Sequence, residues 1–509
     1  MAVILLLSSF SLAGRGSMKS KEKKAEKFYA NGYYSLALPL YQDLLKLNPE
    51  ELKYKMKVGV CLLQTRKRRE SIPYLESASY GGLTEAYYYL GQAYHYANRL
   101  DEALNAYLMF KKLASVEAYL ESDIDKMINT TLTAKEMMKN PVNVEIQNMG
   151  SKINSESSDY VPVISADESV LIFTSRREGT TGGLKDFDNE YFEDVYIAFK
   201  EGDDWTNAIN IGPEINTPSH DASIGLSPDG QKLFIYRTNK DVYGGDIYES
   251  VLDGTMWSTP TKLPPEINSG NWEPSASLSS DGNYLYFASN RPGGYGGRDI
   301  YVSKRLPDGR WGIAQNLGAI INSKYDEDAP FIHPDGKTLY FSSKGHKNMG
   351  GFDIFKSELK DGLWTIPENI GYPINTVDDD IYFVLSAQGK RGYYSSNREG
   401  GLGGQDIYQI NMEVEEVPLT LIKGYVVGTS KTPVKSVIHV IDNDTKELQG
   451  IYTSNASSGK YILILPPGKS YKIIVEAEGF HSLSQNFDVP EVNQYKEIIH
   501  DFELKPLSK

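Results

Sequence analysis

Cysteine and histidine are scarce in this chain of 509 residues. Its one cysteine, Cys61, can form neither an intramolecular disulfide nor a cysteine-based zinc site. The seven histidines are scattered singly, without the paired spacing of an HExxH zinc site. These two absences argue against most classes of metalloenzyme.

Long hydrophobic runs are also missing. One apolar run, residues 2–13, has 12 residues, which is too short to span a bilayer. Small residues before Gly14 match a cleavage site, so residues 1–13 are predicted to be a secretory signal peptide and the protein is expected to be exported. The first basic residue, Arg15, follows the run, whereas a signal peptide usually has a basic residue before it. The alternative is therefore that the run forms an apolar cap on the first helix. No cysteine follows it, so no lipid anchor is expected there.

Charge is unevenly distributed. Residues 1–140 hold 20 Lys and Arg against 15 Asp and Glu, whereas the remainder holds 33 against 52, and the net charge is −14. Phosphate groups would be repelled by so acidic a surface, so nucleic acid is not an expected partner.

Residues 19–140 have a helical apolar period and few prolines. Within this segment we predict three helical hairpins at spacings near 34 residues. The third is the clearest and contains Gly91, Tyr94 and Tyr107. The segment resembles tetratricopeptide repeats, whose stacks usually expose a groove for peptides or helices. Packing against the rest of the chain is the alternative. The basic residues 66–69 are interpreted as a solvated turn or a docking patch.

A repeat of 52–54 residues runs through residues 142–412. It carries an Ile-Asn pair, an Asp-Gly turn, an Asp-Ile-Tyr tripeptide or near variant, and a tryptophan, all in phase. The asparagines are Asn154, Asn216, Asn268, Asn322 and Asn375, and the tripeptide aspartates are Asp194, Asp246, Asp299, Asp353 and Asp406. The first unit is ten residues longer because of an insertion around residues 179–192.

Each unit contains four strand signals. In residues 322–371 these are 328–333, 337–343, 352–358 and 364–370. Four antiparallel strands at this period are typical of β-propeller blades. Residues 142–149 look like an orphan fourth strand, and the last unit stops after its third strand near Met412. We therefore predict five blades, closed by pairing of the two ends so that no open edge remains.

Two segments carry a family resemblance. Ser289-Asn290-Arg291 with Gly296-Gly297-Arg298-Asp299-Ile300-Tyr301, and Ser396-Asn397-Arg398 with Gly403-Gly404-Gln405-Asp406-Ile407-Tyr408, resemble the WD40-like repeats of TolB-type propellers. In that family these residues are structural. Each unit has an arginine or lysine at the end of its second strand (Arg176 or Arg177, Arg237, Arg291, Lys344, Arg398), predicted to pair with the third-strand aspartate of its own unit.

Residues 418–505 predict a small β-sandwich of short strands, at residues 423–427, 436–442, 460–465 and 471–477. Gly459-Lys460-Tyr461, Leu465-Pro466-Pro467-Gly468 and Glu478-Gly479-Phe480 resemble the carboxypeptidase regulatory-like, transthyretin-like module. In that family the module is a non-catalytic accessory domain.

Catalytic motifs are not found in the sequence. There is no Gly-x-Ser-x-Gly elbow, Walker A loop or dinucleotide fingerprint after a strand. Residues 186–190 with Glu193 and Asp194 have a calcium-like spacing but lack the glycine and terminal glutamate of an EF-hand, so they are interpreted as a solvated acidic loop, as are residues 378–380. We predict no enzyme, no cofactor and no catalytic, cofactor-binding or metal-binding residues.

The order of the segments resembles the PorE-like, OmpA-family envelope proteins of the Bacteroidetes, which act in type IX secretion. The resemblance implies a periplasmic, outer-membrane-associated scaffold that binds envelope proteins. The peptidoglycan-binding OmpA-like domain of that family would begin about where this chain ends, so the chain is a fragment or lacks that anchor. The alternative is a glycan- or peptide-binding sensor that uses the propeller channel, with Trp272 and Tyr295 as candidate aromatics.

Overall fold

A computed structural model gives the fold of the chain as two compact units. It describes residues 18–65, 67–238, 244–412 and 416–507. The first unit comprises Met1–Asn140 and Lys185–Glu190, and the second comprises Pro141–Leu184 and Tyr191–Lys509. The predicted signal peptide, residues 1–13, lies outside the described residues.

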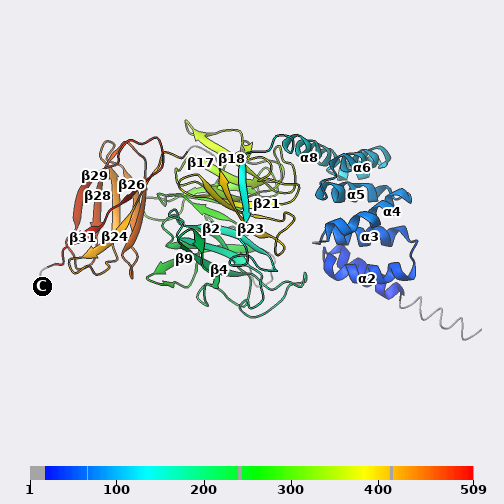
Figure 1. Ribbon diagram of the computed structural model, residues 1–509, viewed down its shortest axis with the longest axis horizontal. Helices are drawn as coiled ribbons and strands as arrows, with labels where there is room; N and C mark the ends of the chain where they lie inside the picture. Colours follow the sequence, from blue (N-terminus) through cyan, green and yellow to red (C-terminus); the bar gives the residue numbers. More distant parts are fainter. Residues whose placement is uncertain (1–17, 66, 239–243, 413–415, 508–509) are drawn as a thin grey trace, which may run out of the picture. The chain divides into compact units, whose positions relative to one another are not determined.

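The first unit is helical (Figure 1). Its helices are residues 18–30, α2 (Tyr34–Leu47), α3 (Leu52–Leu63), α4 (Ile72–Tyr80), α5 (Thr84–Tyr96), α6 (Leu100–Leu113), α7 (Val116–Glu121) and α8 (Ile124–Met137), with a 3-10 turn at η1 (Arg68–Ser71). Successive helices pack as hairpins because small residues let them approach. A Cβ atom on Gly91 would lie 2.4 Å from the ring of Tyr107, and one on Gly59 would lie 2.7 Å from Leu75.

The basic segment at the second hairpin includes η1. The guanidinium of Arg68 lies over the ring of Tyr96, 4.2 Å from its centroid, and Arg66 lies outside the described residues. Among the helices that the structure describes, none is long and apolar enough to cross a membrane.

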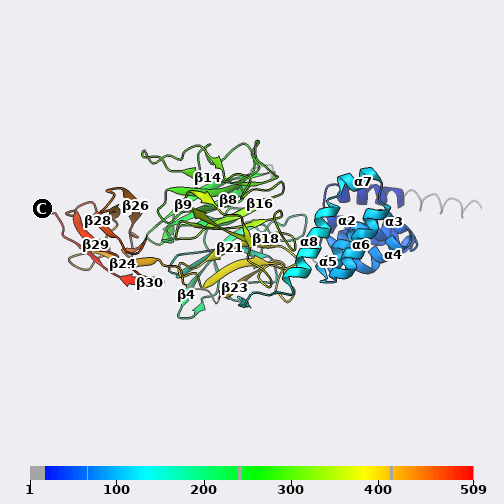
Figure 2. The same cartoon turned by 90° about the horizontal axis from the view of Figure 1, so that it is seen from above.

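The second unit begins with five successive antiparallel sheets in the described part of the chain (Figures 1 and 2). The first contains β2 (Asp159–Ile164), β3 (Val170–Ser175), β4 (Asp194–Glu201), β5 (Asp204–Trp205) and β6 (Ile209–Asn210). The second contains β7 (Asp221–Leu226), β8 (Lys232–Thr238), β9 (Gly245–Asp253), β10 (Met256–Trp257) and β11 (Thr261–Lys262).

The third sheet contains β12 (Ala276–Leu278), β13 (Tyr284–Ser289), β14 (Asp299–Lys304) and β15 (Gln315–Asn316). The fourth contains β16 (Glu327–Ile332), β17 (Thr338–Ser343), β18 (Asp353–Lys360), β19 (Leu363–Trp364) and β20 (Glu368–Asn369). The fifth contains β21 (Asp380–Leu385), β22 (Arg391–Ser396), β23 (Asp406–Met412) and β1 (Val144–Asn148).

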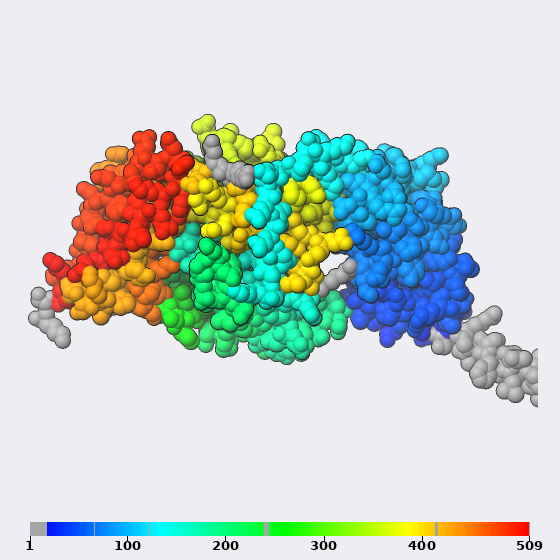
Figure 3. All heavy atoms as spheres, in the orientation of Figure 1, coloured from blue at the N-terminus to red at the C-terminus, as the bar shows by residue number. Residues whose placement is uncertain are grey.

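The pairing of the two ends is confirmed. β1 pairs antiparallel with β23, from Val144 opposite Met412 to Asn148 opposite Tyr408. Figure 3 shows the cyan atoms of β1 beside the yellow atoms of the last sheet. The first strands of the sheets also contact one another in order. β2 contacts β7, β7 contacts β12, β12 contacts β16, β16 contacts β21, and β21 contacts β2 again. We call this arrangement the five-sheet ring.

The fourth strand of the example unit differs from the prediction. Residues 364–370 form two short strands, β19 and β20, both paired with β18. Pro367 lies between them, and proline has no amide hydrogen for the ladder. The other three predicted strands correspond to β16, β17 and β18 within a few residues.

Residues 420–504 form two further sheets around a shared apolar core. One contains β24 (Thr420–Gly428), β27 (Lys460–Leu465), β30 (Lys496–Ile499) and β31 (Phe502–Leu504). The other contains β25 (Val437–Asp442), β26 (Leu448–Thr453), β28 (Ser470–Glu476) and β29 (Leu483–Asp488). We call this pair of sheets the C-terminal sandwich.

Candidate functional site

The asparagine of the Ile-Asn landmark ties each sheet to the next one. The Asn322 side chain accepts a hydrogen bond from the Ile300 amide at 2.7 Å and donates one to the Ile300 carbonyl oxygen at 3.0 Å. It therefore pairs with the third strand of the preceding sheet as another strand would. The same two bonds join Asn154 to Ile407, Asn216 to Val195, Asn268 to Ile247 and Asn375 to Ile354.

The arginines hold the first strand of their own sheet. The predicted pairing with the third-strand aspartate is wrong. Arg177 lies 2.6 Å from the Asp159 carboxylate at the start of β2, and it donates at 2.5 Å to the Ile153 carbonyl oxygen of the preceding landmark. Equivalent ion pairs join Arg237 to Asp221, Arg291 to Glu273 and Arg398 to Asp380.

The third-strand aspartates have a different task. Asp299 accepts hydrogen bonds from the amides of Tyr295 and Gly296 at 2.6 and 3.0 Å, and from the Asn316 side chain at 2.7 Å. The carboxylate thereby fixes the glycine-rich loop that precedes its own strand. In two other sheets burial is the main cause of a raised pKa at the equivalent aspartate. The pKa of Asp194 is raised, and that of Asp353 is raised well above its usual value.

The fourth sheet departs from this pattern. Its sequence is Ser343-Lys344-Gly345 where the third and fifth sheets have Ser-Asn-Arg. His346 takes the landmark carbonyl instead, with Nε2 2.8 Å from the Ile321 oxygen. Lys344 lies near Asp326 at 3.8 Å, not near the acid of its own first strand, Glu327. The missing arginine after β17 is the sequence signal for this difference.

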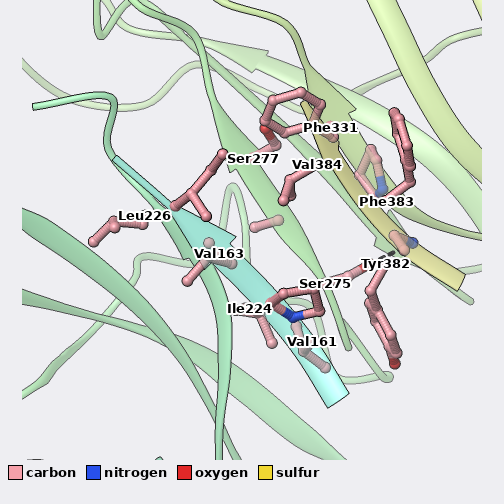
Figure 4. A pocket seen from close by; sticks show the side chains of 16 residues that line it. Val161, Val163, Ile224, Leu226, Ser275, Ser277, Phe331, Tyr382, Phe383 and Val384 are labelled. Carbon is pink, nitrogen blue, oxygen red and sulfur yellow. Dashed lines mark hydrogen bonds between the residues drawn. The ribbon is translucent and has the colours of Figure 1, made fainter. Parts of the chain in front are cut away.

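The first strands of the five sheets surround a central cavity. Each of β2, β7, β12, β16 and β21 contributes to its wall, which is largely apolar (Figure 4). Val161, Ala329 and Tyr382 on three of these strands have positive φ angles at bulges. The cavity volume is about 30 Å³, whereas small-molecule pockets have about 300–1,000 Å³. This cavity therefore has room for water molecules rather than for a glycan.

Charged side chains gather where the first strands begin. Glu193 is 3.0 Å from His220 Nδ1 and accepts a hydrogen bond from the Tyr160 hydroxyl, which links the first two sheets. Burial alone would raise the pKa of Glu193, but the hydrogen bonds from His220 and Tyr160 outweigh it and leave that pKa below its usual range. The histidine and tyrosine therefore keep this carboxylate ionised.

A second network lies between the third and fourth sheets. Arg298 is 2.5 Å from Asp328 and 3.4 Å from Asp326, while the Ser275 hydroxyl donates to Asp328 at 2.5 Å. Charges in both networks are paired across neighbouring sheets. Glu193 and Arg298 stand in segments that the sequence pointed to for other reasons, an acidic loop and the repeat motif, and their partners in the neighbouring sheets were not predicted.

The two candidate aromatics both belong to the third repeat. The Trp272 ring lies against the Arg298 guanidinium, 4.8 Å from its central carbon, and the residue is 37% exposed. Tyr295 is 55% exposed in the loop before β14. Trp272 is thus held in place with part of its surface open to solvent.

The acidic segments contribute to local structure. Asp188 accepts a hydrogen bond from the Glu190 amide at 3.0 Å, and Asp379 accepts one from the Phe352 amide at 2.9 Å. Asp380, the last residue of the other acidic run, is the ion-pair partner of Arg398. Within the described ranges, no group of three or more His, Cys, Asp and Glu side chains is placed to hold a metal ion.

The C-terminal sandwich contacts the hairpin turns at the far ends of the first strands. Leu421 and Ile462 of the sandwich pack with Ala166 and Ala387 of the ring. Lys460 lies 2.5 Å from Asp167. Burial by itself would raise the pKa of Asp167, but the charge of Lys460 and hydrogen bonds from nearby hydroxyl groups outweigh burial, so this pKa is lowered. The turn ends of the first and fifth sheets are thus joined to the sandwich.

Comparisons with known proteins give partial likenesses only. No protein-family model matches the chain, and no curated protein matches it. One solved structure is the Yersinia enterocolitica type III secretion chaperone SycD with a peptide of the translocator YopD, 14% identical over 24% of this chain and 95% of that one, with a TM-score of 0.22. Another is the Sgt2 TPR domain of Aspergillus fumigatus, 20% identical over 24% and 82%, with a TM-score of 0.21.

Hydroxyquinol 1,2-dioxygenase from Pseudomonas putida DLL-E4 is 13% identical over 17% of this chain, with a TM-score of 0.14. The match spans 56% of the dioxygenase. With such low TM-scores, none of these likenesses carries an argument about fold, and none is evidence of an enzymatic activity.

Proposed function

We propose that the chain is a non-enzymatic adaptor of the bacterial cell envelope that binds proteins through its outer surfaces. In this proposal tetratricopeptide-like helices precede a five-bladed WD40-like propeller and a carboxypeptidase regulatory-like sandwich. The resemblance to PorE-like proteins of the OmpA family supports a periplasmic, outer-membrane-associated location and a part in type IX secretion.

One observation carries the proposal: the residues that recur through the repeats, with the arginine present in four of the five, are used to hold the sheets together. The Arg177 guanidinium, the Asn322 amide and the Asp299 carboxylate all have their partners inside the ring. The cavity between the first strands, with a volume of about 30 Å³, is far smaller than a usual small-molecule pocket. Recognition is therefore assigned to the helices and to the outer faces of the sheets.

The helical unit offers a mixed aromatic and charged face. Lys57 lies 3.5 Å from the centroid of the Tyr29 ring and 3.5 Å from Glu26. Lys53 is one turn earlier on α3, so it shares this face, and it is exposed. In stacked helical hairpins, a face made by successive helices is the usual place for a bound peptide or helix.

A photoreactive amino acid at Lys53 is expected to crosslink to envelope proteins when the full chain is produced in its own host. The same amino acid at Lys112, an exposed position on α6, is the matched control and is expected to label much less. Crosslinked bands are identified by mass spectrometry. Equal labelling at both positions, or a protein confined to the cytoplasm, would contradict the proposal.

A glycan-binding role is the second candidate, favoured by the fixed, half-open ring of Trp272. If it is correct, Trp272→Ala lowers glycan affinity about two- to ten-fold, since an aromatic stack contributes ~0.5–1.5 kcal/mol. Tyr425→Ala, at an exposed aromatic of the C-terminal sandwich, is the control that should bind normally. Glycan arrays make the measurement, and unchanged binding by the Trp272 variant excludes this candidate.

A further inference from the structure

Among the described residues, no cationic side chain forms an ion pair with the acid of the fourth sheet. In the other four sheets of the described ring, an arginine neutralises the buried acid at the start of the first strand. Glu327 occupies this position in the fourth sheet and is 0% exposed. It accepts hydrogen bonds from the Ser323 and Ser343 hydroxyls at 2.6 Å, and from the Ser323 amide at 2.7 Å.

The charged groups near Glu327 do not compensate for this. Asp299 on β14 carries a negative charge that disfavours ionisation of Glu327. The nearby cations Arg298 and Lys344 lie against Asp326, and Arg298 also pairs with Asp328. A carboxylate at this position is therefore supported by neutral donors alone.

His346, on the loop that follows β17, takes the place of the arginine found in the other sheets. Its ring stands where an arginine stands in the other sheets, on the landmark carbonyl, and contacts the rings of Phe341 and Phe355 at centroid distances of 5.9 and 5.4 Å. Burial lowers the pKa of His346, so the neutral ring is favoured. The cation of the other sheets is thus replaced by a neutral side chain.

The energetic consequence has a definite sign. Burial raises the pKa of Glu327 from 4.5 to about 7. Between these two values the folded chain holds a proton that the opened chain has lost, so stability decreases as pH rises through this window. Above pH 7 the folded sheet must hold an uncompensated buried carboxylate.

We propose that the fourth sheet is a proton-sensitive element of the ring: Glu327 releases its proton as the surroundings change from acidic to alkaline, and the two loops that its carboxyl group joins then loosen. The loops are residues 318–326 and 344–352. The first carries Ser323, and the second follows Ser343 directly. This property is separate from the proposed binding function, because it concerns the ring alone.

Hydrogen exchange of the full chain tests the proposal. From pH 6 to pH 8, protection of these two loops, corrected for intrinsic exchange rates, is expected to fall about ten-fold. The matched loops 371–379 and 397–405 of the fifth sheet, whose acid Asp380 is paired with Arg398, are the internal control. They are expected to change less.

Glu327→Gln should remove the pH dependence. The glutamine oxygen can accept from the Ser323 amide, and its NH₂ group can donate to the two serine hydroxyls, so the site stays satisfied. A ten-fold loss that persists in Glu327→Gln would overturn the proposal. If that variant does not fold, the wild-type comparison decides: an equal pH response in the fourth and fifth sheets overturns it as well.

Discussion

Replacing Arg177 with methionine is expected to destabilise the five-sheet ring by about 3–5 kcal/mol, because it leaves a buried charge without its partner. The Asp159 side chain is 0% exposed, and Arg177 is its cation at 2.6 Å. Arg177 also holds the Ile153 carbonyl, so the change loosens the link to the preceding landmark. The double variant Arg177→Met/Asp159→Asn should recover part of the loss, since the buried carboxylate at position 159 is then replaced by an uncharged amide.

The tryptophans make this measurement specific. All five lie between residues 205 and 364, so urea unfolding followed by tryptophan fluorescence reports on the ring. Arg310→Met is the matched control, since Arg310 pairs with Asp308 on the surface with its side chain 78% exposed. It is expected to leave the unfolding midpoint unchanged. An equal shift in both variants would show that the buried pair has no special part.

The second large effect is expected from Asn154→Ala, which removes the clamp between the two ends of the ring. Asn154 follows β1 and bonds to both the amide and the carbonyl of Ile407 on β23, each at 2.9 Å. Its loss leaves the buried Ile407 amide without a partner, whereas the Ile407 carbonyl oxygen keeps the Met149 amide at 3.2 Å, so the expected cost is about 1–3 kcal/mol. The closing sheet should therefore open more readily than the other four.

Hydrogen exchange resolves where this happens. In Asn154→Ala, peptides from β1 and β23 are expected to lose protection, whereas those from β12 to β14 should change little. Asn207→Ala, at an exposed asparagine, is the control. If protection falls evenly over all five sheets, the asparagine acts on overall stability and not on closure.

Much of the ring could be predicted because its repeat is strict. The phase of the Ile-Asn landmark alone placed residues 142–149 beside the last sheet, and β1 pairs there with β23. In the C-terminal sandwich the predicted strands near residues 423, 436, 460 and 471 correspond to β24, β25, β27 and β28. Of the remaining strands, β30 is largely exposed and β31 has only three residues, although Phe502 and Leu504 are buried. Strands as short as these give little apolar alternation to read from the sequence.

The partner of the arginines could not be predicted in the same way. Asp299 and Glu273 both belong to the third repeat, and sequence spacing alone does not separate them as partners of Arg291. The choice depends on side-chain direction: the guanidinium reaches the landmark carbonyl of Ile267, which lies next to the first strand. His346 was missed because a histidine does not match the arginine pattern, although its carbonyl contact is equivalent.

The candidate site at the start of the first strands was beyond sequence reasoning for another reason. Glu193, His220, Arg298 and Asp328 meet only because the ring brings consecutive sheets together. The bulges at Val161 and Tyr382 depend on positive φ angles that valine and tyrosine rarely adopt. Tertiary packing imposes both features, and neither has a local signature.

The register of the closing strand determines how the ring would respond to mechanical tension. Val144, the first residue of β1, lies opposite Met412, the last residue of β23, so the chain enters and leaves this sheet at the same end. A pulling force applied to those two ends would separate the strands one hydrogen-bonded pair at a time, like a zipper, instead of shearing all pairs together. The contact of the C-terminal sandwich with the hairpin turns carries that load first. Detachment of the sandwich would then be the step that exposes the closing sheet to force.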